Sequence, residues 1–182
     1  QQSTYHNPHG NYMVKPMQKI EMYFDSVVPL VNQPENHLIN EQQWEQKYTI
    51  KDDELPQYLD QPENIWGETD RVSYAEITQN HITITQSLYL IQVKNLKLYI
   101  KKHEKPEKHE KPEKHEKRRA SFLYNGVTYD LAVTDPKFDE YVSEGMEILC
   151  ISLGEEYKGS CFKLVATVFY RRAMLPHEIP EL

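Results

Sequence analysis

Short runs in which apolar and polar residues alternate dominate the chain and predict a structure made mostly of strands. In LKLYIK (96–101), apolar residues at 96, 98 and 100 alternate with Lys97, Tyr99 and Lys101. A period of two places the two sets on opposite faces of one strand. Other strand-like runs, rich in β-branched and aromatic residues, lie at 20–31, 81–93, 120–133, 146–154 and 160–170. We therefore expect a mainly β fold of six or seven short strands.

Turn residues and helix caps divide these runs. Asn125-Gly126 lies between two strand-like segments and is the strongest short-range hairpin signal in the chain. A short polar turn is expected from Gly154 to Gly159. Asn40 can cap a short helix around Trp44, and Asp52 or Asp53 can cap a second one.

A repeat of His, Glu, Lys and Pro in six-residue units occupies residues 101–119 (KKHEKPEKHEKPEKHEKRR). It follows one predicted strand and precedes another, so we interpret it as an insertion in a loop. Proline at every sixth position prevents a continuous helix, and the repeat has no apolar residue to bury. We therefore expect a disordered charged loop over 101–119.

Two functional interpretations of the repeat are weaker. His103, His109 and His115 recur every six residues and are candidate metal ligands, but the lysines beside them would repel a cation. Lys117, Arg118 and Arg119 could form a nucleic-acid-binding arm, but five interleaved glutamates cancel much of its attraction. We predict neither a bound metal nor a cofactor.

The net charge of −7 conceals an uneven distribution. Residues 101–119 contain nine Lys or Arg and five Glu, a local charge of +4, so the remainder carries −11. An acidic body repels phosphate at long range unless its charges are segregated on one face. The charge therefore argues against broad, non-specific affinity for nucleic acid.

Length and composition limit the class of protein. A chain of 182 residues with 38% hydrophobic content can form one compact domain or two very small ones. No apolar run reaches the roughly 18 residues that a membrane-spanning helix needs, and no signal peptide is visible. The two cysteines, Cys150 and Cys161, lie in apolar runs that predict buried strands. We expect a cytoplasmic protein that does not bind membranes.

Short catalytic signatures are absent from the sequence. It has no glycine-rich phosphate loop, HExxH, CxxC or GxSxG motif, and we predict that the protein is not an enzyme. Cys150 could pair with a nearby histidine such as His81, but its apolar neighbours favour a structural thiol. Asp135, before Pro136, is more typical of a turn residue than of a catalytic carboxylate.

Five stretches of the sequence resemble a bacterial family, the dual OB-containing domain. They are NQPENHLI (32–39), DQPENIWG (60–67), SLYLIQVKNLKLYI (87–100), RASFLYNGVTYDLAVTDP (119–136) and ISLGEEYKGSCFKLVATVF (151–169). The resemblance implies two small OB-type β-barrels in tandem with short helices. We place the first lobe at 1–86, the second at 87–172 and a C-terminal tail at 173–182.

Residues 1–19 depart from the pattern of this family. Members usually begin with a further segment of strands, which QQSTYHNPHGNYMVKPMQK does not resemble. The resemblance thus leaves open whether the first barrel is complete. A barrel that lacks strands has an unpaired edge, so the chain is truncated, a partner supplies the missing strand, or this lobe is reduced.

Aromatic residues among cations are the candidate binding residues. The sequence has 13 tyrosines, and OB-type faces stack bases on aromatic rings. The candidates are Lys97, Tyr99, Lys101, Arg119, Phe122 and Tyr124. A competing interpretation is that most of these rings lie in the core.

Two function classes remain open from the sequence. The first is a binding module for single-stranded nucleic acid or a nucleotide-like ligand, which follows from OB-type stacking and the family resemblance. The second is a regulatory module that binds a protein partner through its acidic body or an open strand edge.

Overall fold

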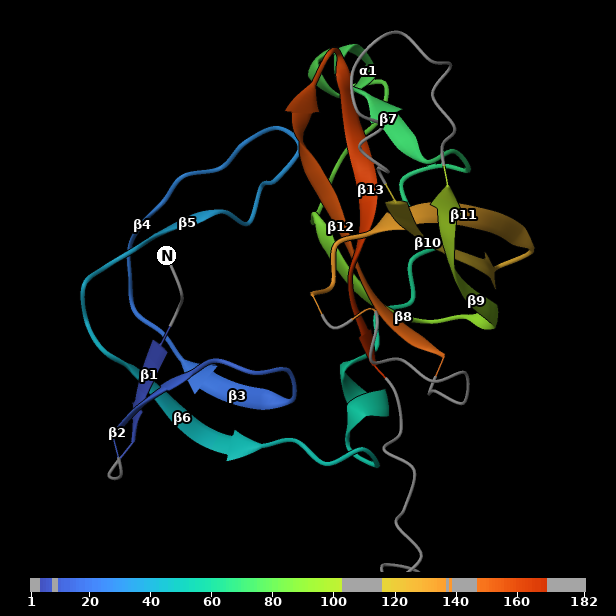
Figure 1. The fold of residues 1–182 in the computed structure, drawn as a ribbon. Coiled ribbons are helices and arrows are strands. Elements are labelled where there is room, and N and C mark those ends of the chain that lie inside the picture. Colours follow the sequence, from blue (N-terminus) through green and yellow to red (C-terminus); the bar gives the residue numbers. More distant parts are fainter. Residues whose placement is uncertain (1–3, 8–9, 103–115, 137, 139–146, 170–182) are drawn as a thin grey trace, which may run out of the picture. The chain divides into compact units, whose positions relative to one another are not determined.

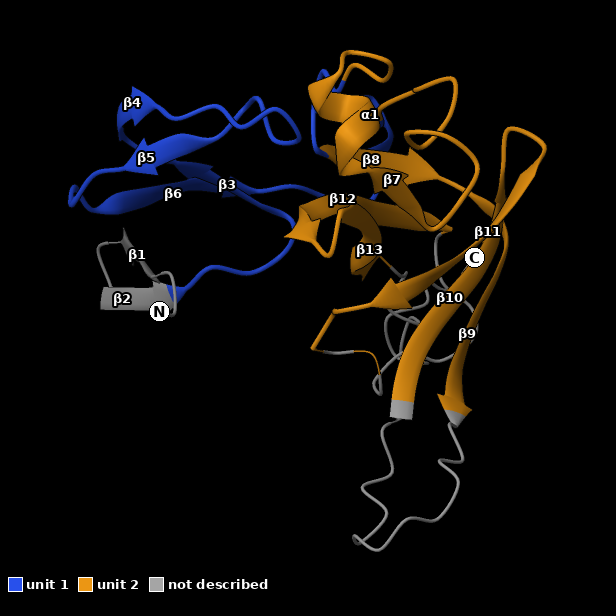
Figure 2. Cartoon of the chain, turned by 90° about the horizontal axis from the view of Figure 1, so that it is seen from above, with its two compact units in different colours: residues 1–59, 84–87 blue, residues 60–83, 88–182 orange. Residues whose placement is uncertain are grey.

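The computed structural model describes residues 4–7, 10–102, 116–136, 138 and 147–169, which form a mainly β structure (Figure 1). The chain divides into two compact units: unit 1 comprises residues 1–59 and 84–87, and unit 2 comprises residues 60–83 and 88–182 (Figure 2). The sequence suggested one boundary between residues 86 and 87. The units differ from it because residues 60–83 contribute a strand to the second sheet.

The described part of unit 2 contains one helix and seven strands, and the strands form a single sheet. The elements are β7 (Arg71–Ser73), α1 (Tyr74–Thr78), β8 (Leu88–Gln92), β9 (Lys94–Lys102), β10 (Glu116–Tyr124), β11 (Val127–Val133), β12 (Ile148–Tyr157) and β13 (Ser160–Phe169). The strand order is β8-β12-β13-β11-β10-β9, and β7 pairs with β13. All neighbours are antiparallel except β11 and β13, which are parallel.

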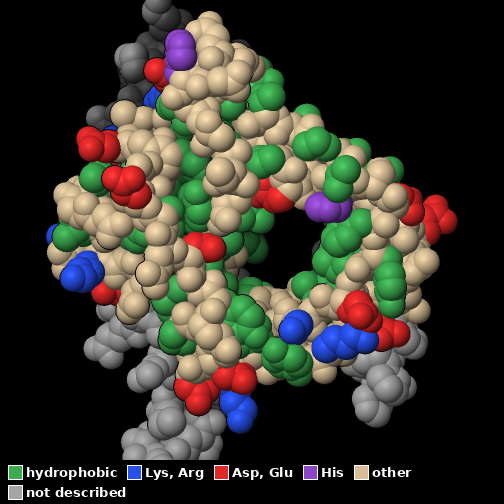
Figure 3. Space-filling model, turned by 180° about the vertical axis from the view of Figure 1, so that it is seen from behind, with side chains coloured by type: hydrophobic (Ala, Val, Ile, Leu, Met, Phe, Trp, Pro, Cys, Tyr) green, Lys and Arg blue, Asp and Glu red, His purple; other side chains and the backbone are tan. Residues whose placement is uncertain are grey.

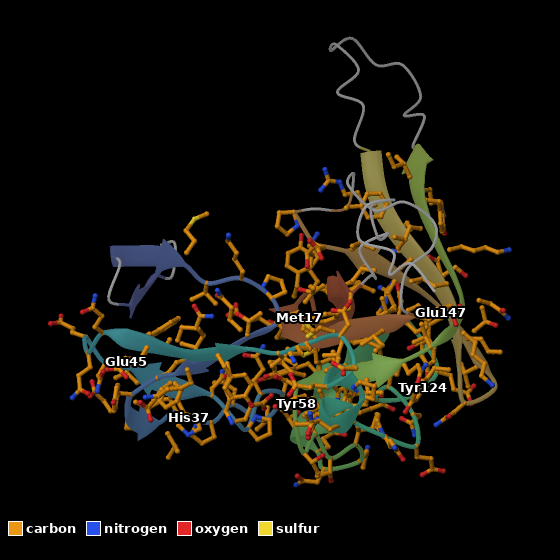
Figure 4. All side chains as sticks on the ribbon, turned by 90° about the horizontal axis from the view of Figure 1, so that it is seen from below. Met17, His37, Glu45, Tyr58, Tyr124 and Glu147 are labelled. Carbon is orange, nitrogen blue, oxygen red and sulfur yellow. The ribbon has the colours of Figure 1, made fainter. Side chains whose placement is uncertain are left out.

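The two end strands of this sheet, β8 and β9, follow each other directly along the chain. Only Val93 separates β8 from β9, so the path of paired strands curls back to where it began. The bend is held at Glu147, whose carbonyl accepts the N–H of Val93 at 2.7 Å and whose carboxylate accepts the N–H of Leu96 at 3.2 Å (Figure 4). A meander of β9, β10 and β11 followed by a parallel step to β13 is the strand connectivity of an OB-type fold.

The core of unit 2 lies inside this curled sheet. Alternate residues of β10, β11, β12 and β13 face inward, which is the period of two that the sequence predicted. The side chains less than 2% exposed include Phe122, Tyr129, Leu131, Leu149, Ile151, Leu153 and Val165. Phe122 and Tyr129 stack with ring centroids 5.7 Å apart.

Tight turns close the β10–β11 and β12–β13 hairpins of unit 2. Asn125 and Gly126 have φ values of 44° and 84°, as a type I′ turn requires, so the predicted hairpin is confirmed. The second turn consists of Lys158 and Gly159, with φ values of 52° and 80°. It is shorter than predicted because β12 continues through Gly154 to Tyr157.

The predicted loop over 101–119 is shorter at both ends. β9 continues to Lys102 and β10 begins at Glu116, with Lys101 opposite Lys117. The remaining residues of the repeat, 103–115, lie outside the described residues, as does the predicted tail at 173–182.

Unit 1 contains short strands and one turn of 3-10 helix. The elements are β1 (Thr4–Asn7), β2 (Gly10–Met13), β3 (Gln18–Glu21), β4 (Phe24–Val27), β5 (His37–Ile39), β6 (Trp44–Thr49) and η1 (Leu55–Tyr58). Four strands form a sheet in the order β2-β1-β6-β3, and β4 pairs with β5 separately. Among the described residues of unit 1, these strands form no closed path.

Three predictions in unit 1 and the adjoining segment are wrong. The helix expected around Trp44 is strand β6, because pairing with β1 and β3 overrides its local helix propensity. The strand expected at 20–31 is divided into β3 and β4. The strand expected at 81–93 is reduced to β8, and helix α1 was not expected.

Many apolar side chains of unit 1 lie at the surface. They include Val27, Leu30, Val31, Leu38 and Ile39, which are 47–67% exposed. Green patches mark hydrophobic side chains over β4 and β5 in Figure 3. Leu55 and Ile84 are the buried hydrophobic residues among those described in this unit. Unit 1 therefore has much less core than unit 2.

No helix in the described part of the chain is long and apolar enough to cross a membrane.

Candidate ligand-binding face

Cationic and aromatic side chains lie together on the outer face of β9 and β10. The antiparallel register places Tyr99 opposite Arg119 and Lys101 opposite Lys117. Lys97 lies two residues before Tyr99 and shares its face. We call these five residues, Lys97, Tyr99, Lys101, Lys117 and Arg119, the basic face. All are exposed except Arg119, which is half-buried.

A carboxylate from the neighbouring strand fixes two members of the basic face. The Tyr99 hydroxyl donates to Asp130 Oδ2 at 2.7 Å, and Arg119 Nε donates to Asp130 Oδ1 at 3.0 Å. The hydrogen bond to Asp130 is the main reason that the pKa of Tyr99 is raised, and the Tyr99 hydroxyl must keep its proton to donate this bond. Tyr99 and Arg119 are thus held in place before any ligand arrives.

The basic face has a net positive charge although the chain is acidic. It has four cations, and Asp130 offsets one of them, which leaves a formal charge of +3. Lys97, Tyr99 and Lys101 occupy alternate positions, so successive side chains lie roughly 7 Å apart along β9. A line of cations around an aromatic ring can contact the phosphates and a base of an extended strand.

The structure separates Phe122 and Tyr124 from the other four candidates. Both lie on the inner face of β10, where they are 1% and 8% exposed. The Tyr124 hydroxyl donates to the carbonyl of Pro62 at 2.7 Å (Figure 4). Because residues 119 and 122 differ by an odd number of positions, they point to opposite faces of the strand. These two rings belong to the core.

The remaining candidates are the three histidines of the repeat, which the sequence offered as metal ligands. His103, His109 and His115 lie outside the residues that the structure describes. Within the described part, no group of three His, Cys, Asp or Glu side chains could hold a metal ion.

Cys150 and Asp135 have structural environments. Burial raises the pKa of the Cys150 thiol, which opposes formation of the nucleophilic thiolate. Asp135 is 3% exposed and accepts the N–H of Val168 at 3.0 Å. This bond ties the end of β11 to β13, and the carbonyl of Asp135 accepts the N–H of Phe138 at 3.2 Å, as in the predicted turn.

Sequence reasoning considered Lys117 only as part of an arm of the repeat and did not include Lys117 or Asp130 among the six candidate binding residues. The signal for Lys117 was available, because it lies two residues before Arg119 in a strand. The position of Asp130 beside the basic face depends on the pairing of β10 with β11, in which Asp130 lies opposite Ser121. The hairpin predicted at Asn125-Gly126 fixes that register.

Comparisons with known proteins identify a family. Searches of the curated proteins and of the solved structures found no match. The model of the dual OB-containing domain matches residues 1–168, and this match includes residues 1–19, contrary to the departure expected from the sequence. The chain belongs to the dual OB-containing domain family.

Proposed function

We propose that the protein is a non-enzymatic binding module that takes single-stranded nucleic acid on the basic face of unit 2. The observation that carries this proposal is the alternation of Lys97, Tyr99 and Lys101 beside Lys117 and Arg119. OB-type folds use the face of their second and third strands for oligonucleotides. In unit 2 the second and third strands of the β9-β10-β11 meander are β10 and β11, and the basic face lies on β9 and β10, so the two regions share β10.

Segregated charge supports a nucleic acid as the ligand. The acidic total of −7 argued against phosphate binding only if the charges were evenly spread. Four cations gathered on one face create a local positive field despite the total. Single-stranded binders combine such a field with rings on which bases stack. Tyr99 is 37% exposed and supplies a ring at the centre of the face.

Strand addition by a protein partner is the second candidate. β9 is at one end of the paired path, and among the described strands it pairs only with β10. An open edge of this kind can accept a strand from a partner. However, lysines along an edge strand discourage such pairing, and β9 carries Lys97 and Lys101 on its outer face. The basic face therefore favours nucleic acid.

The test measures fluorescence anisotropy of a labelled single-stranded oligonucleotide at several salt concentrations. The variant Lys97→Ala/Lys101→Ala/Lys117→Ala removes three cations from the basic face. Its matched control, Lys15→Ala/Lys19→Ala/Lys51→Ala, removes three exposed lysines from unit 1. Because each single-strand phosphate contact adds about 0.7 to the salt slope, the first variant should lower the slope by about 2. The control should leave it unchanged.

Three outcomes would overturn the proposal. They are no binding at low salt, an equal loss of binding in the control variant, or binding that does not depend on salt. The last outcome would show that the oligonucleotide does not bind through phosphate contacts with the basic face.

A further inference from the structure

A second feature of unit 2 is a segment that crosses the end of the β10–β11 hairpin. Residues 61–67, which we call the strap, contain no helix or strand. The Tyr124 hydroxyl donates to the carbonyl of Pro62 at 2.7 Å. Asn125 Nδ2 donates to the carbonyls of Pro62 and Glu63 at 3.2 and 3.1 Å. The first half of the strap is therefore fixed to the hairpin.

The other end of the strap is held from inside the curled sheet. Two side chains donate to the carbonyl of Gly67: Lys163 Nζ at 2.7 Å and the Tyr129 hydroxyl at 3.1 Å. Lys163 is 1% exposed, so this contact is shielded from water. A segment without regular structure is thus held by side chains at both ends.

The strap holds Trp66 in an unusual conformation. Its φ is 49°, in the left-handed region that a bulky residue rarely adopts. The indole stacks on Tyr89 of β8, with ring centroids 4.7 Å apart and planes at 26°. Backbone strain of this kind persists only where the surroundings enforce it, and it is concentrated at ligand sites. The four side chains that fix the strap provide that enforcement.

A hollow of about 500 Å³ lies beside this aromatic pair. It is lined by strap residues that include Pro62, Glu63 and Trp66, by residues 81–83 and by Tyr89. Sites for small organic ligands have volumes of about 300 to 1,000 Å³ and combine apolar walls with a few polar groups. Here Pro62, Ile82 and the two rings are the apolar part, and His81 and Thr83 are polar.

The charge of the hollow differs from that of the basic face. None of the described residues that line it is a lysine or an arginine, and Glu63 contributes a carboxylate. A phosphate would lie near this acidic residue with no lysine or arginine in the described lining beside it. An uncharged planar ring would instead pack against the aromatic walls without that repulsion.

We propose that this hollow binds an uncharged planar heteroaromatic ligand of nucleoside size, which packs its ring against Tyr89, beside Trp66, a side chain only 6% exposed. The site is separate from the basic face and does not depend on it. The absence of lysine and arginine from the described lining selects against ligands that carry a phosphate.

The experiment uses the full chain with Trp44→Phe, which leaves Trp66 as its one tryptophan. Adenosine and adenosine 5′-monophosphate are titrated separately while the fluorescence of Trp66 is followed. Adenosine should give a saturable change, and the monophosphate should bind about fivefold more weakly because of Glu63. Glu63→Gln should bring the two affinities closer together.

Two tyrosine variants test the aromatic wall. Tyr89→Leu should weaken adenosine about tenfold or more, as expected for the loss of a stacking ring. Tyr89→Phe keeps the ring, so this variant should bind adenosine as the parent does. Loss of binding in Tyr89→Leu alone would then result from loss of the ring. Tyr157→Leu removes an exposed tyrosine near the β12–β13 turn and should have no effect.

The same titration distinguishes this proposal from the nucleic-acid proposal. The variant with Lys97, Lys101 and Lys117 replaced by alanine should bind adenosine as the parent does. The hollow proposal is overturned if adenosine gives no saturable change, if the monophosphate binds equally well or better, or if Tyr157→Leu weakens binding as much as Tyr89→Leu.

Discussion

Lys163 Nζ donates a 2.7 Å hydrogen bond to the carbonyl of Gly67 from a side chain that is 1% exposed. The ammonium also lies 5.5 Å from the centre of the Tyr129 ring. Burial lowers the pKa of Lys163 to about 8, and the charge of Asp70 opposes this shift only in part. A buried cation thus fixes the strap at a cost in folding free energy.

Because of this cost, the free energy of unfolding should change with pH in the alkaline range. Between the folded pKa of about 8 and the ordinary value of 10.5, the unfolded chain binds more protons at Lys163. The free energy of unfolding therefore rises with pH across this window, by about 2 kcal/mol between roughly pH 7 and pH 9.5. Urea denaturation should show that this rise is missing in Lys163→Met.

Lys158→Met is the matched control for that measurement, because Lys158 is exposed in the β12–β13 turn. It should follow the pH dependence of the parent. If the free energies of unfolding of the parent and of Lys163→Met differ by the same amount at every pH, burial of the charged amine does not destabilise the fold.

Rings on the two faces of the β9–β10 pair should differ in their effect on stability. Phe122→Ala removes a ring that is 1% exposed and should lower the free energy of unfolding by about 3 to 5 kcal/mol. Tyr99→Phe removes only the hydroxyl bonded to Asp130 and should cost about 1 kcal/mol or less. Chemical denaturation measures both. Similar losses would contradict the assignment of the faces.

The alternation of residues predicted much of the candidate site. Lys97, Tyr99 and Lys101 were expected on one face, and the structure places them there. Phe122 and Tyr124 were grouped with Arg119 because of their chemistry, although their even positions place them on the opposite face. The period of two was sufficient to separate them, so this error was avoidable.

Other features depend on contacts that local sequence does not specify. Trp44 follows a good helix cap, but pairing of β6 with β1 and β3 decides its conformation. The strap is fixed by Tyr124, which is 62 residues from its acceptor Pro62, and by Lys163, which is 96 residues from Gly67. No periodicity in residues 61–67 indicates these bonds.

Replacement by glycine should have opposite effects in the two turns. Lys158 has a φ of 52° that an ordinary side chain adopts at a cost, so Lys158→Gly should stabilise the fold by about 1 kcal/mol. Asn125 tolerates its φ of 44° and also bonds to the strap, so Asn125→Gly should destabilise it by about 1 kcal/mol. If Asn125→Gly raised the urea midpoint as much as Lys158→Gly, the hydrogen bonds from Asn125 to the strap would contribute nothing to stability.

The two cysteines should react slowly with an alkylating reagent until the protein unfolds. Burial raises the pKa of both thiols, and only the thiolate reacts. Cys161 is 0% exposed, whereas Cys150 is half-buried, so Cys150 should react first in the native protein. Mass spectrometry of tryptic peptides after treatment with iodoacetamide at neutral pH, with and without denaturant, gives the rate at each cysteine, because cleavage at Lys158 separates them. Native Cys161 that reacts as fast as the denatured chain would show that the β12–β13 core opens readily.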